Sequence, residues 1–199
     1  MSGFYLKKMI SGLDTEANVD SSVKSNQKKE ENVIMLVGDG MGPSQVSAAA
    51  YLKGKGYVAG ELTMDQFSNL GYARTFSHDN TVTDSAAAVT AFSSANKTDN
   101  GVVGKAPKTV EHSENEDHFN VESVLESAEK ADKSTGLVST ARITHATPAA
   151  FASHVENRDN ENEIAKQMLL DHDIEVLLGG GKRHFLPKED GGKREDGKT

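Results

Sequence analysis

A serine preceded by an aspartate, at the expected start of a helix, is the feature of this sequence best suited to chemistry. The small residues of TDSAAAVT predict a helix over Asp84 to Ala95. Free N–H groups and the helix dipole at its N-terminus favour an anion such as a phosphoryl group, which the Ser85 hydroxyl can attack. No adjacent histidine or GxSxG elbow supplies a base, so metal coordination is the expected route to activation. Alternatively, Asp84 or Ser85 only caps the helix.

Asp39 is a candidate cation ligand because it follows the apolar run NVIMLV, residues Asn32 to Val37, after a single glycine. In open α/β sheets ligands collect beyond the carboxyl ends of the strands, where this carboxylate would lie. An ordinary turn aspartate remains the alternative.

His145 and Thr147 follow another expected strand, and donors two residues apart can share the coordination shell of one hard cation. Arg158 lies eleven residues after Thr147, and its planar guanidinium can hold two phosphate oxygens. The alternatives are a structural histidine and an arginine paired with acidic neighbours at the surface.

The apolar runs and helical spacings alternate, which predicts a three-layer α/β/α sandwich with a mostly parallel central sheet. Asn32 to Val37 is apolar throughout and predicts a strand buried on both faces. The glycines before Lys182 lack phosphate-loop spacing and predict a strand-end turn. The expected strands are 32–37, 71–77, 135–140 and 174–178, and the expected helices are 43–52, 84–95, a helix capped by Asn120, and 160–172.

Composition excludes several classes of function. The net charge of −8 argues against nucleic-acid binding, and no stretch approaches the roughly 20 apolar residues that cross a membrane. The absence of cysteine leaves His and carboxylate as metal ligands. No signal peptide is evident, and residues 1–31 predict a poorly structured leader before one folded region, 32–199.

Four segments, in order from about Asn32 to Phe185, together resemble the bacterial alkaline phosphatases: NVIMLVGDGMG, TVTDSAAAVTAFSSANKTDNGVVG, GLVSTARITHATPAAFASHVENR and EVLLGGGKRHF. The resemblance implies hydrolysis of small phosphate monoesters, with release of inorganic phosphate, on an alkaline-phosphatase-like fold. It also implies a periplasmic or extracellular homodimer. Residues 32–199 would be the N-terminal part of the catalytic domain.

By the same resemblance, Ser85 is the nucleophile that becomes phosphoserine and also a metal ligand. Arg158 matches the arginine that holds the non-bridging oxygens of the substrate, and Asp84 matches its acidic neighbour. Two zinc ions and one magnesium ion are expected in the full-length protein.

Two of the metal ligands are also implied by the resemblance. Asp39 would bridge a zinc and a magnesium, and Thr147 matches a magnesium ligand. His145 matches a position near the magnesium site where family members carry aspartate or histidine, and direct ligation there is left open.

Family members run to about twice this length, and their downstream half supplies most zinc ligands. The chain is therefore expected to be a truncated, nucleophile-bearing part of the family fold that is inactive or nearly so by itself. The alternatives are a related sulfatase or phosphodiesterase, and a non-catalytic phosphate- or metal-binding module or assembly partner. The histidines not expected to serve as zinc ligands are His78, His112, His118, His154, His172 and His184.

Overall fold

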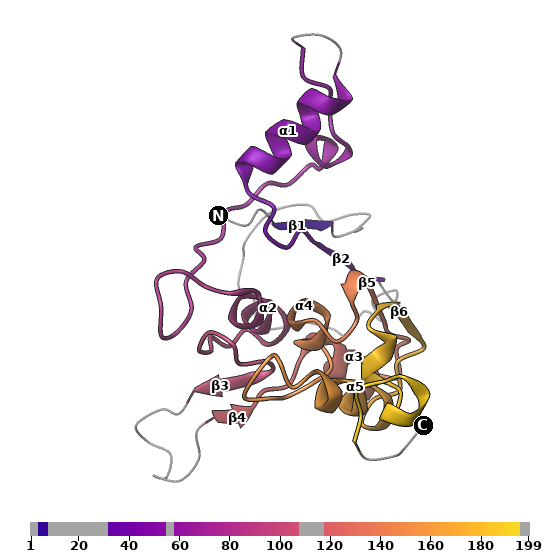
Figure 1. Ribbon diagram of the computed structural model, residues 1–199. Helices are drawn as coiled ribbons and strands as arrows, with labels where there is room; N and C mark the ends of the chain where they lie inside the picture. The colour runs from indigo at the N-terminus through magenta and orange to yellow at the C-terminus, as the bar shows by residue number, and fades with distance from the viewer. Residues whose placement is uncertain (1–3, 8–31, 55–57, 108–117, 196–199) are drawn as a thin grey trace. The chain divides into compact units, whose positions relative to one another are not determined.

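A computed structural model describes residues 4–7, 32–54, 58–107 and 118–195 (Figure 1). The chain divides into two compact units, Met1–Arg74 and Thr75–Thr199. Apart from residues 4–7, the predicted leader 1–31 lies outside the described residues. No helix in the described ranges is long and apolar enough to cross a membrane.

The first unit pairs two short strands and carries one helix. Strand β1 (Phe4–Lys7) runs antiparallel to β2 (Ile34–Val37), and α1 (Pro43–Lys53) and the 3-10 turn η1 (Thr63–Gln66) follow. The predicted strand and helix are thus confirmed, and the proline stands at the first helical position as expected.

The expected burial of β2 in a parallel sheet is wrong for the described residues. Its partner β1 is antiparallel, and Ile34 and Leu36 are 63% and 61% exposed. A continuous apolar run predicts a strand that can be buried on both faces. A two-stranded ribbon has no packed layers that would cover those faces.

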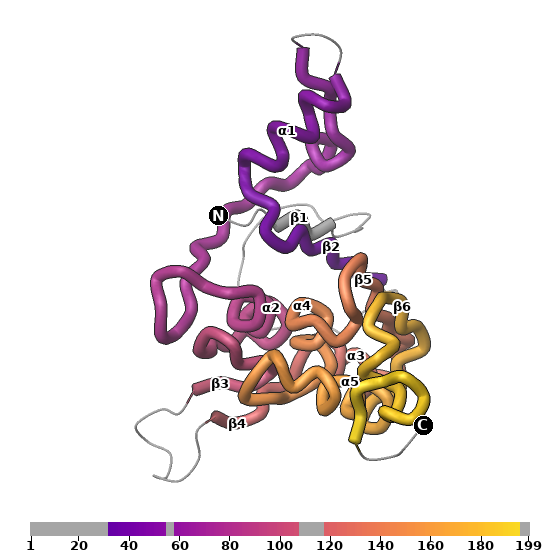
Figure 2. Tube along the Cα trace, viewed as in Figure 1, coloured from indigo at the N-terminus to yellow at the C-terminus, as the bar shows by residue number. Residues whose placement is uncertain are grey.

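The second unit contains the expected alternation of strands and helices (Figures 1 and 2). Strands β5 and β6 pair in parallel, while β3 and β4 pair antiparallel. The elements of this unit are α2 (Ser85–Ser94), β3 (Lys105–Pro107), β4 (His118–Asn120), α3 (Val124–Lys130), β5 (Gly136–Arg142), α4 (Ala146–Ala149), α5 (Glu161–Leu170), β6 (Val176–Gly180), η2 (Lys182–His184) and η3 (Lys188–Asp190).

Two expected elements differ from the structure. Residues 71–77 form no strand. The helix expected after Asn120 begins later, because Ser123 and Glu126 form a reciprocal capping box while Asn120 closes β4. The short elements β3, β4 and α4 were not expected from the sequence.

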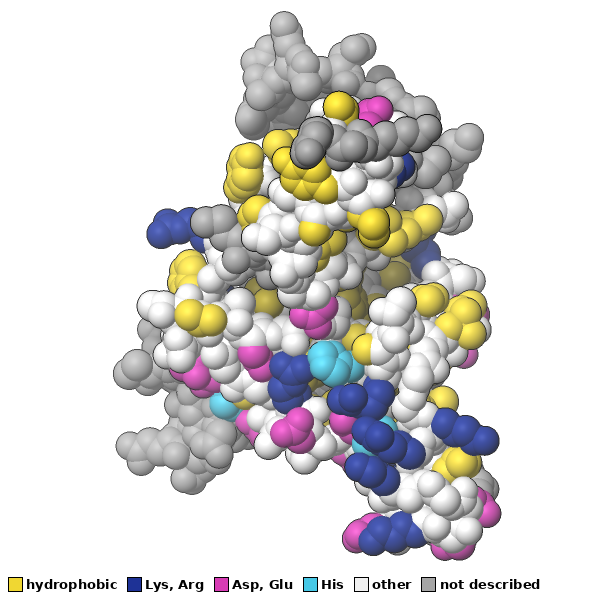
Figure 3. Space-filling model, turned by 45° about the horizontal axis from the view of Figure 1, so that its top comes forward, with side chains coloured by type: hydrophobic (Ala, Val, Ile, Leu, Met, Phe, Trp, Pro, Cys, Tyr) yellow, Lys and Arg dark blue, Asp and Glu magenta, His cyan; other side chains and the backbone are white. Residues whose placement is uncertain are grey.

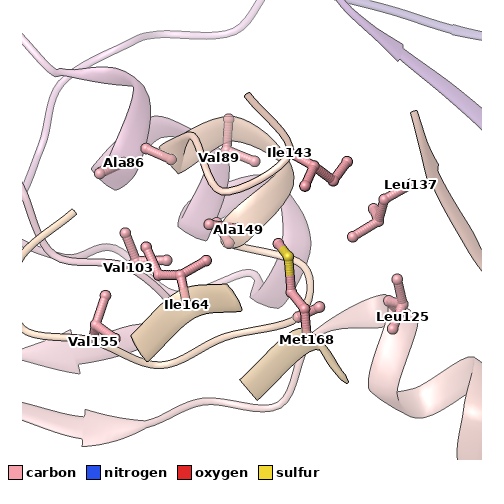
Figure 4. Close-up of a cluster of buried hydrophobic side chains, with 13 residues drawn as sticks. Ala86, Val89, Val103, Leu125, Leu137, Ile143, Ala149, Val155, Ile164 and Met168 are labelled. Atoms are coloured by element: carbon pink, nitrogen blue, oxygen red, sulfur yellow. The ribbon is translucent and has the colours of Figure 1, made fainter. Parts of the chain in front are cut away.

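The core of the second unit gathers small and aliphatic side chains from several elements. Figure 4 shows Ala86 and Val89 of α2 beside Ala149 of α4, with Ile164 and Met168 of α5 nearby, and all five are buried. Alanine at these positions lets α2 and α4 approach closely, and Ser93 Oγ donates a hydrogen bond of 2.6 Å to the Ala150 carbonyl. This close packing positions the first turns of α2 and α4.

Candidate active site

Asp84 caps α2 and leaves the hydroxyl of Ser85 free of that task. Asp84 Oδ1 accepts a hydrogen bond of 2.9 Å from the Ala87 N–H, and Oδ2 accepts one of 3.0 Å from the Gly101 N–H. Helix capping is therefore real, but the aspartate supplies it. Ser85 is the first helical residue, and its side chain is half-buried.

Arg158 joins the start of α2 to the start of α4. Its Nη1 atom donates hydrogen bonds of 3.0 Å to both Ser85 Oγ and Asp84 Oδ2, and Nη2 donates one of 3.1 Å to His145 Nε2. The side chains of Arg158 and Asp84 are 24% and 27% exposed, so a small solute can reach them. The alternative of a surface ion pair with acidic neighbours in sequence is wrong, because the carboxylate that pairs with Arg158 comes from the cap of α2.

The loop at Asn100 and Gly101 fixes the positions of Asp84 and Arg158 through hydrogen bonds. Asn100 Oδ1 accepts from the Asp84 N–H at 2.9 Å, while Asn100 Nδ2 donates to the Val82 carbonyl at 2.9 Å. The Gly101 carbonyl accepts a 2.8 Å hydrogen bond from the Arg158 N–H, so Gly101 binds the backbone of Arg158 and the carboxylate of Asp84.

The sequence does not predict that Asn100 and Gly101 support Asp84 and Arg158. The dipeptide Asn100-Gly101 is a typical turn signal, and Gly101 has φ of 87°. That signal predicts a turn at these residues, but it does not predict what the turn contacts.

Of the remaining expected metal ligands, two lie at α4 in the second unit and one lies in the first unit. His145 is the N-cap of α4, and Thr147 lies within α4, half-buried. Asp39 belongs to the first unit, where it follows β2 in a turn closed by a 3.2 Å hydrogen bond from the Met41 N–H to the Gly38 carbonyl. The structure thus brings Ser85, Asp84, Arg158 and His145 together, and the ligand role of Asp39 stays a prediction.

The other described histidines all pair with carboxylates. Within residues 4–7, 32–54, 58–107 and 118–195, no three His, Asp or Glu side chains are grouped so as to hold a metal ion. His112 lies outside the described residues. The histidine pairs are His78 with Asp99, His118 with Asp99 and Glu156, His154 with Glu126, His172 with Glu129, and His184 with Glu161.

A comparison with protein families identifies the context of this site. The model of the family described as alkaline phosphatase matches residues 30–199. The chain belongs to the alkaline phosphatase family. The resemblance seen in the four sequence motifs is thereby confirmed, and so is the α/β fold class expected of an alkaline phosphatase.

Individual alkaline phosphatases show the same relationship. Alkaline phosphatase 3 of Bacillus subtilis is 40% identical over 198 residues, which cover 95% of this chain and 41% of that protein. Repressible alkaline phosphatase of Saccharomyces cerevisiae is 40% identical over 176 residues, 84% of this chain and 29% of that protein. The solved alkaline phosphatase of the Antarctic bacterium TAB5 is 38% identical, with a TM-score of 0.66 over 80% of this chain and 41% of that one. The chain spans about two fifths of the length of its Bacillus relative.

Proposed function

We propose that the protein hydrolyses phosphate monoesters and that this chain supplies the nucleophile. The observation that carries the proposal is Ser85 Oγ at the start of α2, 3.0 Å from the guanidinium of Arg158. Ser85 Oγ forms a bond to phosphorus, the ester P–O bond breaks, and the alcohol leaves with a proton. Water then cleaves the phosphoserine, which returns the serine hydroxyl and releases inorganic phosphate.

Arg158 binds the phosphoryl oxygens in this proposal. Its two terminal nitrogens donate hydrogen bonds to the side chains of Ser85, Asp84 and His145, and the Arg158 side chain is 24% exposed. A phosphate group offers stronger, charge-assisted acceptors for the same N–H groups. Asp84 keeps its bonds from the Ala87 and Gly101 N–H groups when the guanidinium turns to a ligand, so the helix start stays in place.

The metal ions expected for this chemistry are fitted in part by the described residues. Oxygen donors such as Asp39 and Thr147 suit a magnesium ion, and a variant of the TAB5 enzyme was solved with Mg bound in its M3 site. A bound cation would lower the pKa of the serine hydroxyl and neutralise phosphoryl charge. His145 Nε2 already accepts from Arg158, and no three possible zinc ligands are grouped in the described ranges. We therefore propose Ser85 and Thr147 as ligands from the second unit, while the ligand role of Asp39 stays a prediction of the resemblance, and the described residues do not form the two zinc sites.

Membership of the alkaline phosphatase family favours monoesters over the sulfate esters or phosphodiesters of related hydrolases. A non-catalytic phosphate-binding protein would bind phosphate but would not hydrolyse a phosphate ester, so a turnover measurement separates the two functions. The periplasmic or extracellular homodimer stays a prediction of the resemblance.

The proposed function is tested by replacing Ser85 with alanine. With zinc and magnesium supplied at alkaline pH, the full-length protein should release p-nitrophenol from p-nitrophenyl phosphate, and Ser85→Ala in it should lower kcat by about 10³-fold or more. Ser94→Ala changes the same residue type at the other end of α2 and should retain activity. Acid quenching with radiolabelled phosphate should trap label on the parent protein only. Phosphate binding without turnover would instead establish the non-catalytic role.

A further inference from the structure

Four cationic side chains gather in the second unit beyond Arg158. We call Arg142, Lys182, Arg183 and Lys193 the basic patch. Arg142 ends β5, Lys182 and Arg183 begin η2 just after β6, and Lys193 lies in the segment after η3. Figure 3 shows Lys and Arg side chains crowded beside histidines on one face of the molecule.

Backbone geometry brings the four residues together. Strands β5 and β6 are parallel and Arg142 is paired with Gly180, so the segments that follow both strands leave from the same edge. Gly181 has φ of 93°, and a Cβ there would lie 3.1 Å from Arg142 Cβ. The Lys193 N–H donates a 2.7 Å hydrogen bond to the Arg183 carbonyl, which fixes these two residues side by side.

Three of the four cations of the basic patch have no acidic partner among the described residues. Glu161 pairs with Arg142 at 2.7 Å and is largely buried. The negative charge of Asp159 also helps to raise the pKa of Arg142. Lys182, Arg183 and Lys193 are exposed and have no carboxylate partner within the described part of the chain. Since the whole chain carries a net charge of −8, this local excess of positive charge is unusual for its surface.

His184, the residue after Arg183, is buried. Burial lowers the pKa of His184, and the positive charges of Arg183, Lys193 and Arg142 lower it further against the opposing effect of Glu161. Its Nε2 accepts a 3.0 Å hydrogen bond from Arg183 Nε, while Nδ1 lies 2.9 Å from Asn162 Oδ1. Nε2 also lies 3.2 Å from Glu161 Oε2, so His184 and Arg142 contact the same carboxylate.

The basic patch adjoins the proposed phosphate site. The His145 N–H donates a 3.0 Å hydrogen bond to the Arg142 carbonyl, and the His145 ring accepts from Arg158. One tight turn, Arg142 to His145, therefore connects the guanidinium at Ser85 with the first cation of the patch. The backbone of the basic patch at Arg142 is thus only three residues from the histidine that contacts Arg158.

We propose that the basic patch binds a second anionic group, such as a second phosphate, of an ester whose first phosphate lies at Ser85 and Arg158. The inference rests on the proposed function and deepens it, because it names the preferred substrates as small phosphate esters with an additional anionic group. Exposed cations attract such a group through water, and this attraction weakens as salt rises.

The test compares two sugar esters that differ by one phosphate, fructose 6-phosphate and fructose 1,6-bisphosphate. Their dissociation constants are measured by titration calorimetry at low ionic strength on the Ser85→Ala protein, so that neither ester is consumed. The bisphosphate should bind at least about fivefold more tightly, the gain available from one good exposed ion pair. Rising salt should reduce that ratio.

Neutralising the patch should remove the preference. In the same background, Lys182→Gln/Arg183→Gln/Lys193→Gln should bring the two affinities together and leave binding of the monophosphate unchanged. A control with the same charge loss, Lys130→Gln/Lys133→Gln/Lys166→Gln, removes exposed lysines on or beside α3 and α5 and should keep the preference. Lys193→Gln alone should reduce the ratio in part, which guards against a folding defect in the triple variant.

Other outcomes separate the two proposals. Equal affinities in the Ser85→Ala protein, or a preference that survives the triple substitution, would overturn the inference while leaving monoester hydrolysis intact. Hydrolysis of fructose 6-phosphate by the protein with Ser85 in place confirms that the proposed function itself holds. If neither ester binds to the Ser85→Ala protein and the protein with Ser85 in place does not hydrolyse fructose 6-phosphate, both proposals are wrong.

Discussion

The Nη1 atom of Arg158 lies 3.0 Å from Ser85 Oγ, across a sequence separation of 73 residues. The same nitrogen also binds the carboxylate of Asp84, which caps the helix that Ser85 begins. One guanidinium nitrogen thus connects the proposed nucleophile to the group that fixes its helix, and a phosphate that binds Arg158 meets Ser85 directly.

Replacing Arg158 should chiefly weaken the binding of phosphate. Loss of charge-assisted hydrogen bonds costs about 1.5–3 kcal/mol, so Arg158→Ala should raise the inhibition constant of inorganic phosphate by roughly 10- to 100-fold. Arg158→Lys should fall between, because lysine retains the charge but not the planar fork. Arg74→Ala removes an exposed arginine of the first unit and serves as the control. An unchanged inhibition constant in Arg158→Ala would reject the proposed role.

Gly101 should be sensitive to alanine for its backbone conformation. With φ of 87° and no atom within 4 Å of an added Cβ, Gly101→Ala meets strain but no clash, and should lower the free energy of unfolding by about 1–2 kcal/mol. Gly71 also has open space around it but lacks a positive φ, so Gly71→Ala should change stability by less than about 0.5 kcal/mol. Urea denaturation measures both, and equal effects would contradict the account.

The sequence predicts the elements of the site better than their contacts. Small residues and an acidic cap are local signals, so α2 begins where the sequence places it, with Asp84 as N-cap. The apolar runs of β5 and β6 also form strands, and their parallel pairing follows from the helices between them. These features depend on residues close in sequence.

Contacts between distant segments are not encoded in local patterns. Arg158 lies in a turn, and its partner Asp84 is the N-cap of α2, 74 residues away, while the sequence neighbours of Arg158 are acidic enough to predict a different pair. Similarly, Glu161 lies among other acidic residues in the sequence, yet it pairs with Arg142 and His184 and is largely buried. Asn120 failed as a helix cap because Ser123 offers the complete capping box with Glu126.

Close packing of α2 against α4 should make Ala149 intolerant of larger side chains. Ala149 is fully buried beside Ala86 and Val89, so Ala149→Leu should cost about 1–3 kcal/mol through overpacking. It should also weaken phosphate binding, because His145, the N-cap of α4, accepts a hydrogen bond from Arg158. Ala48→Leu, at an exposed position of α1, is the matched control. Loss of stability in the control alone would argue against this packing.

The pair of His154 and Glu126 gives the second unit a defined pH dependence. Burial acts to raise the pKa of Glu126, but bonds from His154 and the Ser123 N–H outweigh it and lower the pKa from 4.5 to about 2. Burial acts to lower the pKa of His154, but bonds to Glu126 and the Gly104 carbonyl outweigh it and raise the pKa above 6.5. His154 Nε2 lies 3.1 Å from Glu126 Oε1.

Glu126→Gln should remove this ion pair while preserving the helix cap, since glutamine can still accept from the Ser123 N–H. The lowered pKa of Glu126 stabilises the folded state above pH 4.5, and this stabilisation is lost as the pH falls toward about 2. The raised pKa of His154 stabilises the folded state below pH 6.5, and this stabilisation is lost as the pH rises through the raised pKa. The loss of unfolding free energy should therefore be greatest, on the order of 2 kcal/mol, between these limits and smaller at alkaline pH. Urea denaturation at several pH values measures it, with Glu163→Gln on exposed α5 surface as the control. A loss in Glu126→Gln that is independent of pH would show that the carboxylate acts only as a cap.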